Sequence, residues 1–225
     1  MADKNKPIEN EQGNTQKETD PVKEIIGFVL YVLFLIFMVW VIITFVGQRT
    51  VVDGESMENN FHDGESLWVD KISYRFSDPK RFDVVVFPVY DSDYYRASYL
   101  EAGEDIDEDD MDLEEDEKDE KELFIKRIIA LPGETVRIDD YGSIYVNGTL
   151  LEENYGKEVI NTSSIGRCNE EVKLGDDEYF VMGDNRNASE DSRFYVVGNL
   201  KREKLVGKAV FRLWPLSKFG PIKKN

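Results

Sequence analysis

Residues 25–46 form an unbroken apolar run, IIGFVLYVLFLIFMVWVIITFV, that contains no charged side chain. At ~1.5 Å per residue, a helix over this run is long enough to cross a bilayer's hydrocarbon core of about 30 Å. A cleaved secretory signal is disfavoured, because the apolar region of such a signal is only ~7 to 15 residues long. The following residues, FVGQRTVVDG, also lack a small-x-small cleavage site. The run therefore predicts a retained transmembrane anchor.

Positive charges close to the anchor predict its orientation, because cytoplasmic flanks carry an excess of lysine and arginine. Only Arg49 follows the run before Lys71, whereas four lysines precede it: Lys4, Lys6, Lys17 and Lys23. This bias places the amino terminus in the cytoplasm and residues 47–225 on the outer side of the membrane. Residues 1–24 are polar and lack periodic apolar positions, so they predict a disordered cytoplasmic tail.

Beyond the anchor, short runs rich in Val, Ile, Phe and Tyr alternate with turn residues such as Gly, Asp, Asn and Pro. This pattern is typical of β-strands, and LPGE and DDYGS are typical strand connectors. No amphipathic helix is expected in this part of the chain, so the outer domain is predicted to be mainly β. The predicted strands cover residues 66–72, 82–88, 123–130, 134–138, 143–147, 178–182 and 206–213.

Charge and composition exclude several classes of function. The formal net charge of -18 argues against a nucleic-acid partner, which would need a basic surface. Cys168 and His62 are the single cysteine and the single histidine, so no intramolecular disulfide and no thiolate-based zinc cluster can form. A Ser-His-Asp triad would have to use His62 beside Ser56, although triad members normally come from separate elements of the fold.

An acidic insertion of about residues 91–122 interrupts the strand pattern. Its most acidic part, residues 104–122, holds fourteen Asp and Glu residues against two lysines, and so supplies -12 of the net charge. An EF-hand starting at Asp105 is excluded, because Asp110 stands where the calcium loop needs glycine. The segment predicts a solvated, self-repelling loop between two strands, with loose cation binding or a basic partner as alternatives.

The tetrapeptide DGES occurs twice, at residues 53–56 and 63–66, and each copy ends in a serine. Ser66 opens a strand in which Leu67 and Val69 alternate with Ser66, Trp68 and Asp70, which favours an ordinary strand-edge hydroxyl. Ser56 lies in an irregular stretch about ten residues past the anchor, beside Gly54, which permits unusual backbone geometry. Local sequence leaves Ser56 open to either a structural or a chemical role.

Lys126 is the candidate that could activate a serine, because a hydroxyl becomes a good nucleophile only when a neighbouring base takes its proton. In LFIKRIIA, the strand period of two places Lys126 on one face with Phe124, Ile128 and Ala130. Burial among these side chains would lower the lysine pKa and leave its amine neutral. The alternative is a lysine whose head group reaches out into water.

The segment MGDNRNASEDSRF, residues 182–194, is dense in polar side chains directly after an apolar strand. Such groups are costly against a β core unless they satisfy one another. Asp184 can pair with Arg186, and Asp191 can pair with Arg193. Ser189 could hydrogen-bond a neutral lysine amine and hold it in position.

Taken together, these segments resemble the type I signal peptidases of bacteria, which are membrane-bound serine peptidases with a Ser-Lys dyad. VVDGESM resembles the nucleophile segment, and DGESLWVDK followed by RFDVVVF resembles the next two boxes. IKRIIALPGETV resembles the lysine segment, and GDNRNASEDSR resembles the final box. The matches follow the order of the family behind an amino-terminal anchor and extend from about residue 25 to residue 215.

The resemblance implies an antiparallel, barrel-like catalytic domain and a role for each matching residue. The implied roles are nucleophile for Ser56, general base for Lys126, orientation of the amine for Ser189, support of the site for Asp184, Asp191 and Arg193, and a pocket wall for Met57. The backbone N–H of Ser56 would contribute to an oxyanion hole. Gly54, two residues before the nucleophile, is the residue that Gram-positive members commonly have at this position. A lysine base, in place of the histidine of the endoplasmic-reticulum relatives, points to the bacterial branch.

Three departures from the family pattern stand out. The family usually reads Ser-Met-x-Pro-Thr-Leu, whereas Glu58, Asn59, Asn60 and Phe61 follow Met57 here. The usual RGD is RFD at residues 81–83, and the acidic insertion has no counterpart in typical short members. These departures bear on substrate preference and turnover more than on the dyad, because both reacting side chains remain.

The resemblance implies removal of signal peptides from secretory precursors at the outer face of the cell membrane, by a monomer that needs no metal or organic cofactor. Substrate and bilayer are the expected partners. One alternative is a catalytically silent, membrane-anchored β domain that helps to assemble surface proteins or pili. A self-cleaving Ser-Lys peptidase of the repressor type is a second alternative, and the anchor argues against it.

Overall fold

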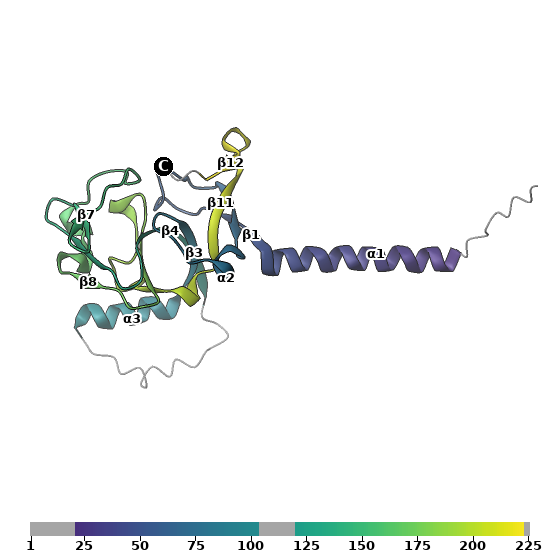
Figure 1. Cartoon of the computed structure of the whole chain (residues 1–225), viewed down its shortest axis with the longest axis horizontal. Helices are drawn as coiled ribbons and strands as arrows, with labels where there is room; N and C mark the ends of the chain where they lie inside the picture. Colours follow the sequence, from purple (N-terminus) through teal and green to yellow (C-terminus); the bar gives the residue numbers. More distant parts are fainter. Residues whose placement is uncertain (1–20, 104–119, 223–225) are drawn as a thin grey trace, which may run out of the picture. The chain divides into compact units, whose positions relative to one another are not determined.

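The computed structural model describes residues 21–103 and 120–222 of the chain, which divides into two units at Val41 and Ile42 (Figure 1). The first unit holds helix α1, Pro21–Val41. Proline suits the first turn of a helix because its missing N–H has no partner there in any case. The helix therefore begins four residues before the apolar run, and residues 21–24 are helical rather than part of the predicted tail. The remainder of that tail lies outside the described residues.

The predicted anchor corresponds to α1 and the π-helical turn η1, Ile42–Val46. Together they form the one helix, within the part of the chain that the structure describes, long and apolar enough to cross a membrane. None of the α1 side chains is buried against protein. An apolar surface of this kind is stable in lipid and costly in water.

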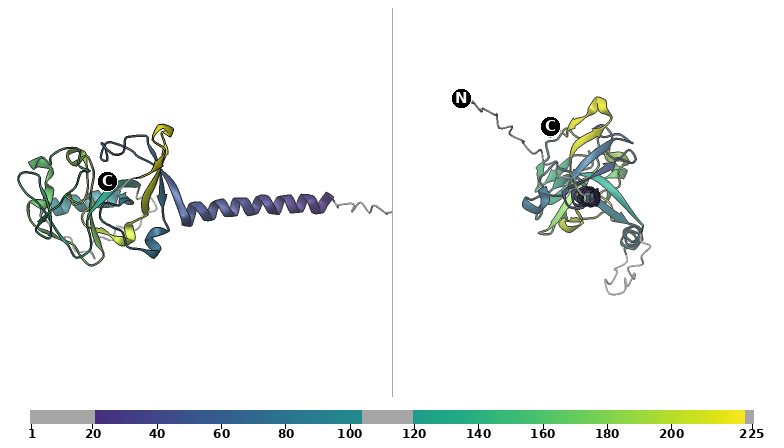
Figure 2. Two further views of the ribbon diagram at one scale, coloured as in Figure 1. Left: turned by 45° about the horizontal axis from the view of Figure 1, so that its top comes forward. Right: turned by 90° about the vertical axis from the view of Figure 1, so that its right-hand side faces the viewer.

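The second unit contains a large antiparallel sheet with the strand order β1-β2-β11-β3-β4-β9-β10, and β12 pairs with β11. Figure 2 shows β11 and β12 as a yellow hairpin. The strands of this sheet are β1 (Gly47–Val51), β2 (Ser66–Asp70), β3 (Val84–Tyr90), β4 (Lys121–Ala130), β9 (Glu178–Met182), β10 (Leu200–Lys201), β11 (Gly207–Trp214) and β12 (Gly220–Pro221).

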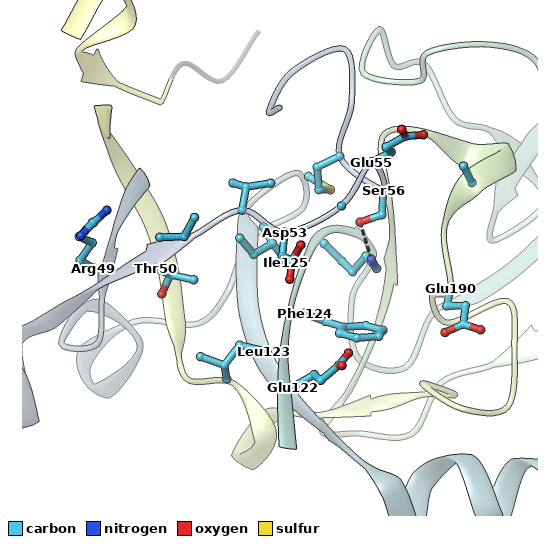
Figure 3. A pocket seen from close by; sticks show the side chains of 16 residues that line it. Arg49, Thr50, Asp53, Glu55, Ser56, Glu122, Leu123, Phe124, Ile125 and Glu190 are labelled. Carbon is cyan, nitrogen blue, oxygen red and sulfur yellow. Dashed lines mark hydrogen bonds between the residues drawn. The ribbon is translucent and has the colours of Figure 1, made fainter. Parts of the chain in front are cut away.

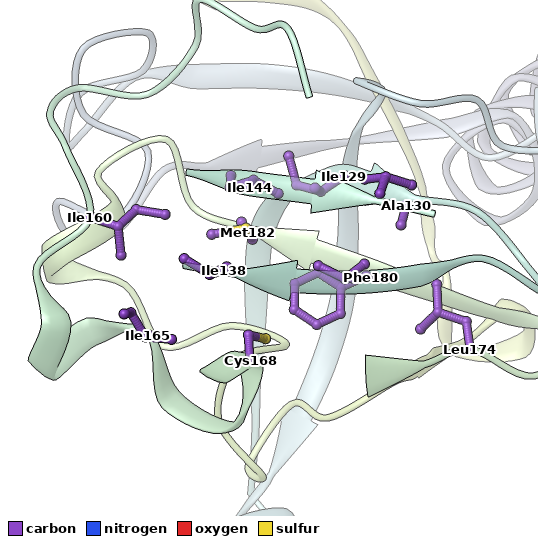
Figure 4. Close-up of a cluster of buried hydrophobic side chains, with 12 residues drawn as sticks. Ile129, Ala130, Ile138, Ile144, Ile160, Ile165, Cys168, Leu174, Phe180 and Met182 are labelled. Atoms are coloured by element: carbon purple, nitrogen blue, oxygen red, sulfur yellow. The ribbon is translucent and has the colours of Figure 1, made fainter. Parts of the chain in front are cut away.

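A smaller antiparallel sheet has the order β7-β6-β5-β8, built from β5 (Thr135–Ile138), β6 (Ile144–Val146), β7 (Thr149–Leu150) and β8 (Val172–Lys173). It packs through a core that includes Ile129 and Ala130 from the end of β4 and Phe180 and Met182 from β9 (Figure 4). The two sheets thus share one apolar cluster, and the prediction of a mainly β, antiparallel domain is confirmed.

Each of the seven predicted strands overlaps an observed strand, but β1 and the two-residue strands β7, β8, β10 and β12 were not predicted. β1 has the sequence GQRTV and directly follows the anchor, so its weak alternation gives little signal. Pairing with β2, with Val51 opposite Ser66, specifies this strand.

The central strand β3 is buried on both faces, which explains its continuous run of apolar residues. Val84 and Val86 belong to one core cluster, whereas Val85, Phe87 and Val89 belong to another on the opposite face. Side chains of adjacent strand residues point to opposite faces, so every position of VVVFPVY meets protein. β4 lies beside β3, and its residues 125–130 are likewise buried on both faces.

Helix α3, Asp91–Ala102, was not expected from the sequence. The Asp93 carboxylate accepts a bond from the Tyr90 N–H at its start, and Gly103 ends it in a left-handed conformation with φ of 75°. Ala97 is its one buried residue, so the apolar stripe is too narrow to be recognised as amphipathic. Packing of Ala97 on the β3 cluster positions the helix. Residues 104–119, which make up most of the acidic segment 104–122, lie outside the described residues.

The remaining helices are single turns. They are α2 (Ser73–Phe76) and the 3-10 turns η2 (Thr162–Ser164), η3 (Gly166–Asn169), η4 (Arg186–Ala188), η5 (Arg202–Lys204) and η6 (Leu216–Lys218).

Candidate active site

Ser56 lies on the loop that joins β1 to β2. Backbone bonds close the base of this loop: Val52 N–H donates to Glu65 O at 2.8 Å, and Gly64 N–H donates to Val52 O at 2.9 Å. Met57 and Phe61 point into the core and are 1% and 2% exposed. The buried side chains of Met57 and Phe61 therefore fix the position of this loop, although it has no regular secondary structure.

The Ser56 hydroxyl meets Lys126, as the sequence predicted. Lys126 Nζ lies 2.7 Å from Ser56 Oγ, and the two side chains point toward each other in the cleft (Figure 3). Strand β4 supplies Lys126, and the nucleophile loop supplies Ser56, 70 residues earlier in the chain. The lysine is 3% exposed, so the alternative of a head group in water does not hold.

Burial lowers the pKa of Lys126 from its ordinary 10.5 to about 8. Nearby carboxylates, chiefly Asp191 and Glu190, oppose this shift because they favour the ammonium form. The net result leaves about one lysine in ten neutral at pH 7 and about half at pH 8. A neutral amine has a free lone pair and can accept the Ser56 proton across the existing contact.

The neighbouring residue, Arg127, is also buried but is fully paired. Its guanidinium makes two bonds to the Asp184 carboxylate, at 2.8 and 2.6 Å, and stacks on the Tyr155 ring at 3.7 Å. Arg186 instead pairs with Glu153, so the predicted Asp184–Arg186 pair is wrong. The physical reason is sheet register: Arg127 lies opposite Met182, which brings the residues just after β9 to the guanidinium.

Asp191 and Arg193 form the pair that the sequence predicted. The Arg193 guanidinium donates to both carboxylate oxygens of Asp191, each at 2.8 Å. Both side chains are fully buried. Asp191 Oδ2 also accepts the Gly183 N–H at 3.0 Å, while Arg193 donates to the Ser164 carbonyl at 2.6 Å. The pair thus ties the loop after β9 to the segment around η2.

Ser189 lies beside the dyad, but its predicted bond to the lysine amine is not formed in this structure. Its Oγ is buried and has no hydrogen-bond partner among the described residues. A Cβ at Gly183 would lie 2.3 Å from Ser189 Oγ and 2.4 Å from the Ser56 carbonyl oxygen. Gly183 therefore allows the nucleophile loop and Ser189 to approach each other, and the role of Ser189 stays a prediction.

Sequence reasoning missed the residues that attach the nucleophile loop to the final box. Asn185 N–H donates to the Ser56 carbonyl at 3.0 Å, and Asn185 Nδ2 donates to the Glu55 carbonyl at 3.1 Å. Asn60 Nδ2 donates to Asp184 Oδ2 at 2.9 Å. The polar density of GDNR was a signal for such contacts, but their partners follow only from the fold.

Two of the departures from the family pattern lie at residues with a left-handed backbone. Asn59, at the position of the usual proline, has φ of 87°, which a proline ring cannot adopt. Phe82, at the position of the usual glycine in RGD, has φ of 69°, and its ring stacks on Tyr155 at 5.1 Å. Asparagine tolerates the left-handed region well, whereas a bulky residue there is strained.

Ser66, Cys168 and His62, which the sequence also singled out, lie away from the Ser56–Lys126 contact or make other contacts. Ser66 is buried and accepts two bonds from the Arg49 guanidinium, at 3.1 and 2.8 Å. Cys168 belongs to the core, where burial raises the pKa of its thiol to about 12. His62 is exposed and contacts Glu65 at 3.5 Å.

A cleft of about 610 Å³ opens above the dyad (Figure 3). Met57 lines it with other apolar side chains such as Val52 and Ile125, while Asp53, Glu55, Glu122 and Glu190 add carboxylates. The role of Met57 in substrate binding stays a prediction. In the two described stretches, no three His, Cys, Asp or Glu side chains gather where they could share a metal ion.

Comparison with known proteins places the chain in a family. Residues 25–214 match the family described as signal peptidase, peptidase S26. A probable signal peptidase I-2 from Synechocystis is 38% identical over 177 residues, covering 79% of this chain and 67% of that protein. Signal peptidase I from Bacillus caldolyticus is 30% identical over 184 residues, covering 78% of this chain and 84% of that protein. A crystal structure of a signal peptidase I from Enterococcus faecalis is similar at 26% identity and a TM-score of 0.38, covering 59% of this chain and 97% of that one.

The chain belongs to the signal peptidase family, peptidase S26, and this confirms its resemblance to the bacterial type I enzymes. It is a membrane-anchored hydrolase that removes signal peptides from precursor proteins. The alternative of a silent assembly module is not favoured.

Proposed function

We propose that Ser56 is the nucleophile and Lys126 the general base of a signal peptidase that acts on the outer face of the membrane. The observation that carries the proposal is the 2.7 Å contact between Ser56 Oγ and a lysine whose pKa burial lowers to about 8. Within the described residues, no carboxylate pairs with Lys126 Nζ, so the amine does not serve as one half of an ion pair. A buried amine in contact with a serine hydroxyl is instead typical of a general base.

The reaction proceeds in two steps. Neutral Lys126 takes the hydroxyl proton, Ser56 Oγ bonds to the scissile carbonyl carbon, and the Ser56 N–H stabilises the developing oxyanion. The carbon–nitrogen bond then breaks, and the lysine ammonium gives its proton to the leaving amine. In the second step, Lys126 takes a proton from a water molecule while the water oxygen bonds to the ester carbonyl carbon. The bond from that carbon to Ser56 Oγ then breaks, the lysine ammonium returns its proton to Ser56 Oγ, and the signal peptide leaves with a new carboxyl terminus.

Other residues support this dyad. Asp184, Asp191 and Arg193 hold the loop after β9 against the nucleophile loop, and Ser189 orients the lysine amine when substrate fills the cleft. Apolar walls that include Met57 select small residues one and three positions before the cut. Both reacting side chains come from one chain, so a monomer suffices.

The anchor defines where this chemistry occurs. Lysines before the helix keep the amino terminus in the cytoplasm, so residues 47–225 lie on the outer side of the bilayer. The nucleophile loop starts within about ten residues of the anchor, and a precursor held in the bilayer by its own signal can reach it.

Purified full-length chain in detergent, incubated with a secretory precursor, tests the proposal. We expect Ser56→Ala and Lys126→Ala each to lower kcat at least about a thousandfold. Ser163→Ala and Lys173→Ala change exposed residues of the same types and should process precursor at the parental rate. The parental rate should rise with pH through about 8, as Lys126 loses its proton. Processing by Ser56→Ala at the parental rate would refute the dyad.

A further inference from the structure

A second cavity continues the active-site cleft toward helix α3. It has a volume of about 560 Å³ and shares two lining residues, Ala188 and Glu190, with the cleft above Ser56. The two cavities therefore meet at the loop that carries Ser189. We call the second cavity the α3 groove.

One face of α3 forms a wall of this groove. Tyr94, Ala97, Ser98 and Glu101 line it, at the spacing of three and four residues that places side chains on one face of a helix. From Tyr94 to Glu101 the helix advances ~10 Å, which matches about three residues of extended polypeptide. The opposite wall is the loop after β9, including Phe194 and Val196.

Glu190 stands at the junction of the two cavities, and a residue of α3 holds it there. The Tyr94 hydroxyl donates a hydrogen bond to Glu190 Oε2 at 3.1 Å. Burial and the neighbouring carboxylate raise the pKa of Tyr94 to about 12, so the phenol stays protonated and remains a donor at neutral pH. Glu190 also faces the cleft near Phe124 and Glu122 (Figure 3).

Among the residues that the structure describes, the charged side chains that line the α3 groove are Glu101 and Glu190, and both are exposed carboxylates. Apolar side chains around Met57 line the cleft above the dyad, and the cleft joins the α3 groove at Ala188 and Glu190. The apolar side suits the small residues before the cut. The residues after the cut then enter a groove whose charge favours lysine or arginine.

We propose that the α3 groove binds the first few residues after the scissile bond and makes a basic residue there a preferred feature of the substrate. The inference rests on the proposed function and deepens it by defining a substrate class. Tyr94 is a positioning residue, because it holds the Glu190 carboxylate at the mouth of the groove.

Paired peptide substrates test the proposal with the full-length chain in detergent. Each pair shares one sequence and differs only by lysine or glutamine at the second, third or fourth position after the cut. We expect lysine to raise kcat/KM up to about fivefold at one or more of these positions, since exposed ion pairs are weak. The preference should shrink in Glu101→Gln and Glu190→Gln, disappear in the double variant, and fall at high salt.

The ratio within each pair separates groove binding from an effect on the dyad. Glu190 also influences the Lys126 pKa, but that influence acts equally on both substrates of a pair and cancels in the ratio. Glu171→Gln, a change of an exposed carboxylate outside the groove, should leave the ratio at its parental value. Equal rates for both parental substrates, or a lysine preference that survives in the double variant, would overturn the inference. Neither outcome bears on the dyad, which the Ser56→Ala variant tests separately.

Discussion

Lys126 and Arg127 are adjacent residues of β4 with almost the same burial, at 3% and 2% exposed. Their side chains lie on opposite faces of the strand, where the surroundings of the two cationic groups differ. On one face Arg127 lies against Asp184, Tyr155 and the Phe82 carbonyl, which together satisfy a permanent cation. On the other face Lys126 meets a neutral hydroxyl and the Phe124 ring, with its Nζ 4.8 Å from the ring centroid.

The difference shows that burial alone does not decide the state of a cation. A guanidinium cannot lose its proton in a protein, so its burial requires a carboxylate partner. An amine can lose its proton, and without a carboxylate in contact it becomes a base near neutral pH. The same substitution at the two positions should therefore have opposite effects on stability.

The largest expected effect is at Arg127. Replacement by methionine keeps most of the volume but leaves the Asp184 carboxylate buried without its cation. Breaking a buried pair by removing one partner costs ~3 to 5 kcal/mol of unfolding free energy. Denaturant unfolding of the full-length chain in detergent, followed by tryptophan emission, measures this loss. A variant as stable as the parent would show that Asp184 finds another partner or takes up a proton.

Lys126→Met should stabilise the protein at pH 7 while it abolishes activity. The pKa of Lys126 is about 8 in the folded chain and 10.5 without burial, so folding below pH 8 costs about 3 kcal/mol at this residue. The unfolded chain binds more protons between these two values, so parental stability rises with pH across that window. The gain of Lys126→Met is therefore greatest at pH 7 and vanishes near pH 11.

The same unfolding assay at pH 7 and pH 10.5 checks this difference, with Lys173→Met as the matched exposed control. Equal stability of parent and Lys126→Met at pH 7 would mean that the amine carries no burial penalty. The pH-dependent activity expected of the dyad would then lose its physical basis.

The smallest expected effect is at Asn60, which connects the nucleophile loop to the Arg127 side of β4. Asn60→Ala removes the bond to Asp184 and a second bond to the Tyr155 carbonyl at 3.2 Å. We expect a loss of ~1 to 2 kcal/mol of unfolding free energy, since Asp184 keeps its arginine. Asn154→Ala, at an exposed position, serves as the control in the same denaturant series. A loss as large as that of Arg127→Met would make Asn60 an equal member of the charge network.

The sequence by itself determined the elements with strong local patterns. The uncharged run at 25–46 gave the apolar helix, and the runs around Val84–Tyr90 and Lys121–Ala130 gave the central strands. It also placed Ser56 and Lys126 among the candidates, because a serine without an available histidine needs another base. Periodicity and side-chain chemistry are local properties, so a single chain reveals them.

Only the tertiary structure decided which side chains meet. The partner of Asp184 is Arg127 rather than Arg186, because the register of β4 and β9 sets that contact. Helix α3 exists because Ala97 packs on β3, and its weak amphipathic pattern did not predict it. The left-handed backbone of Asn59 and Phe82 likewise depends on the loops around them. These features arise from contacts between residues far apart in the chain, which no local pattern encodes.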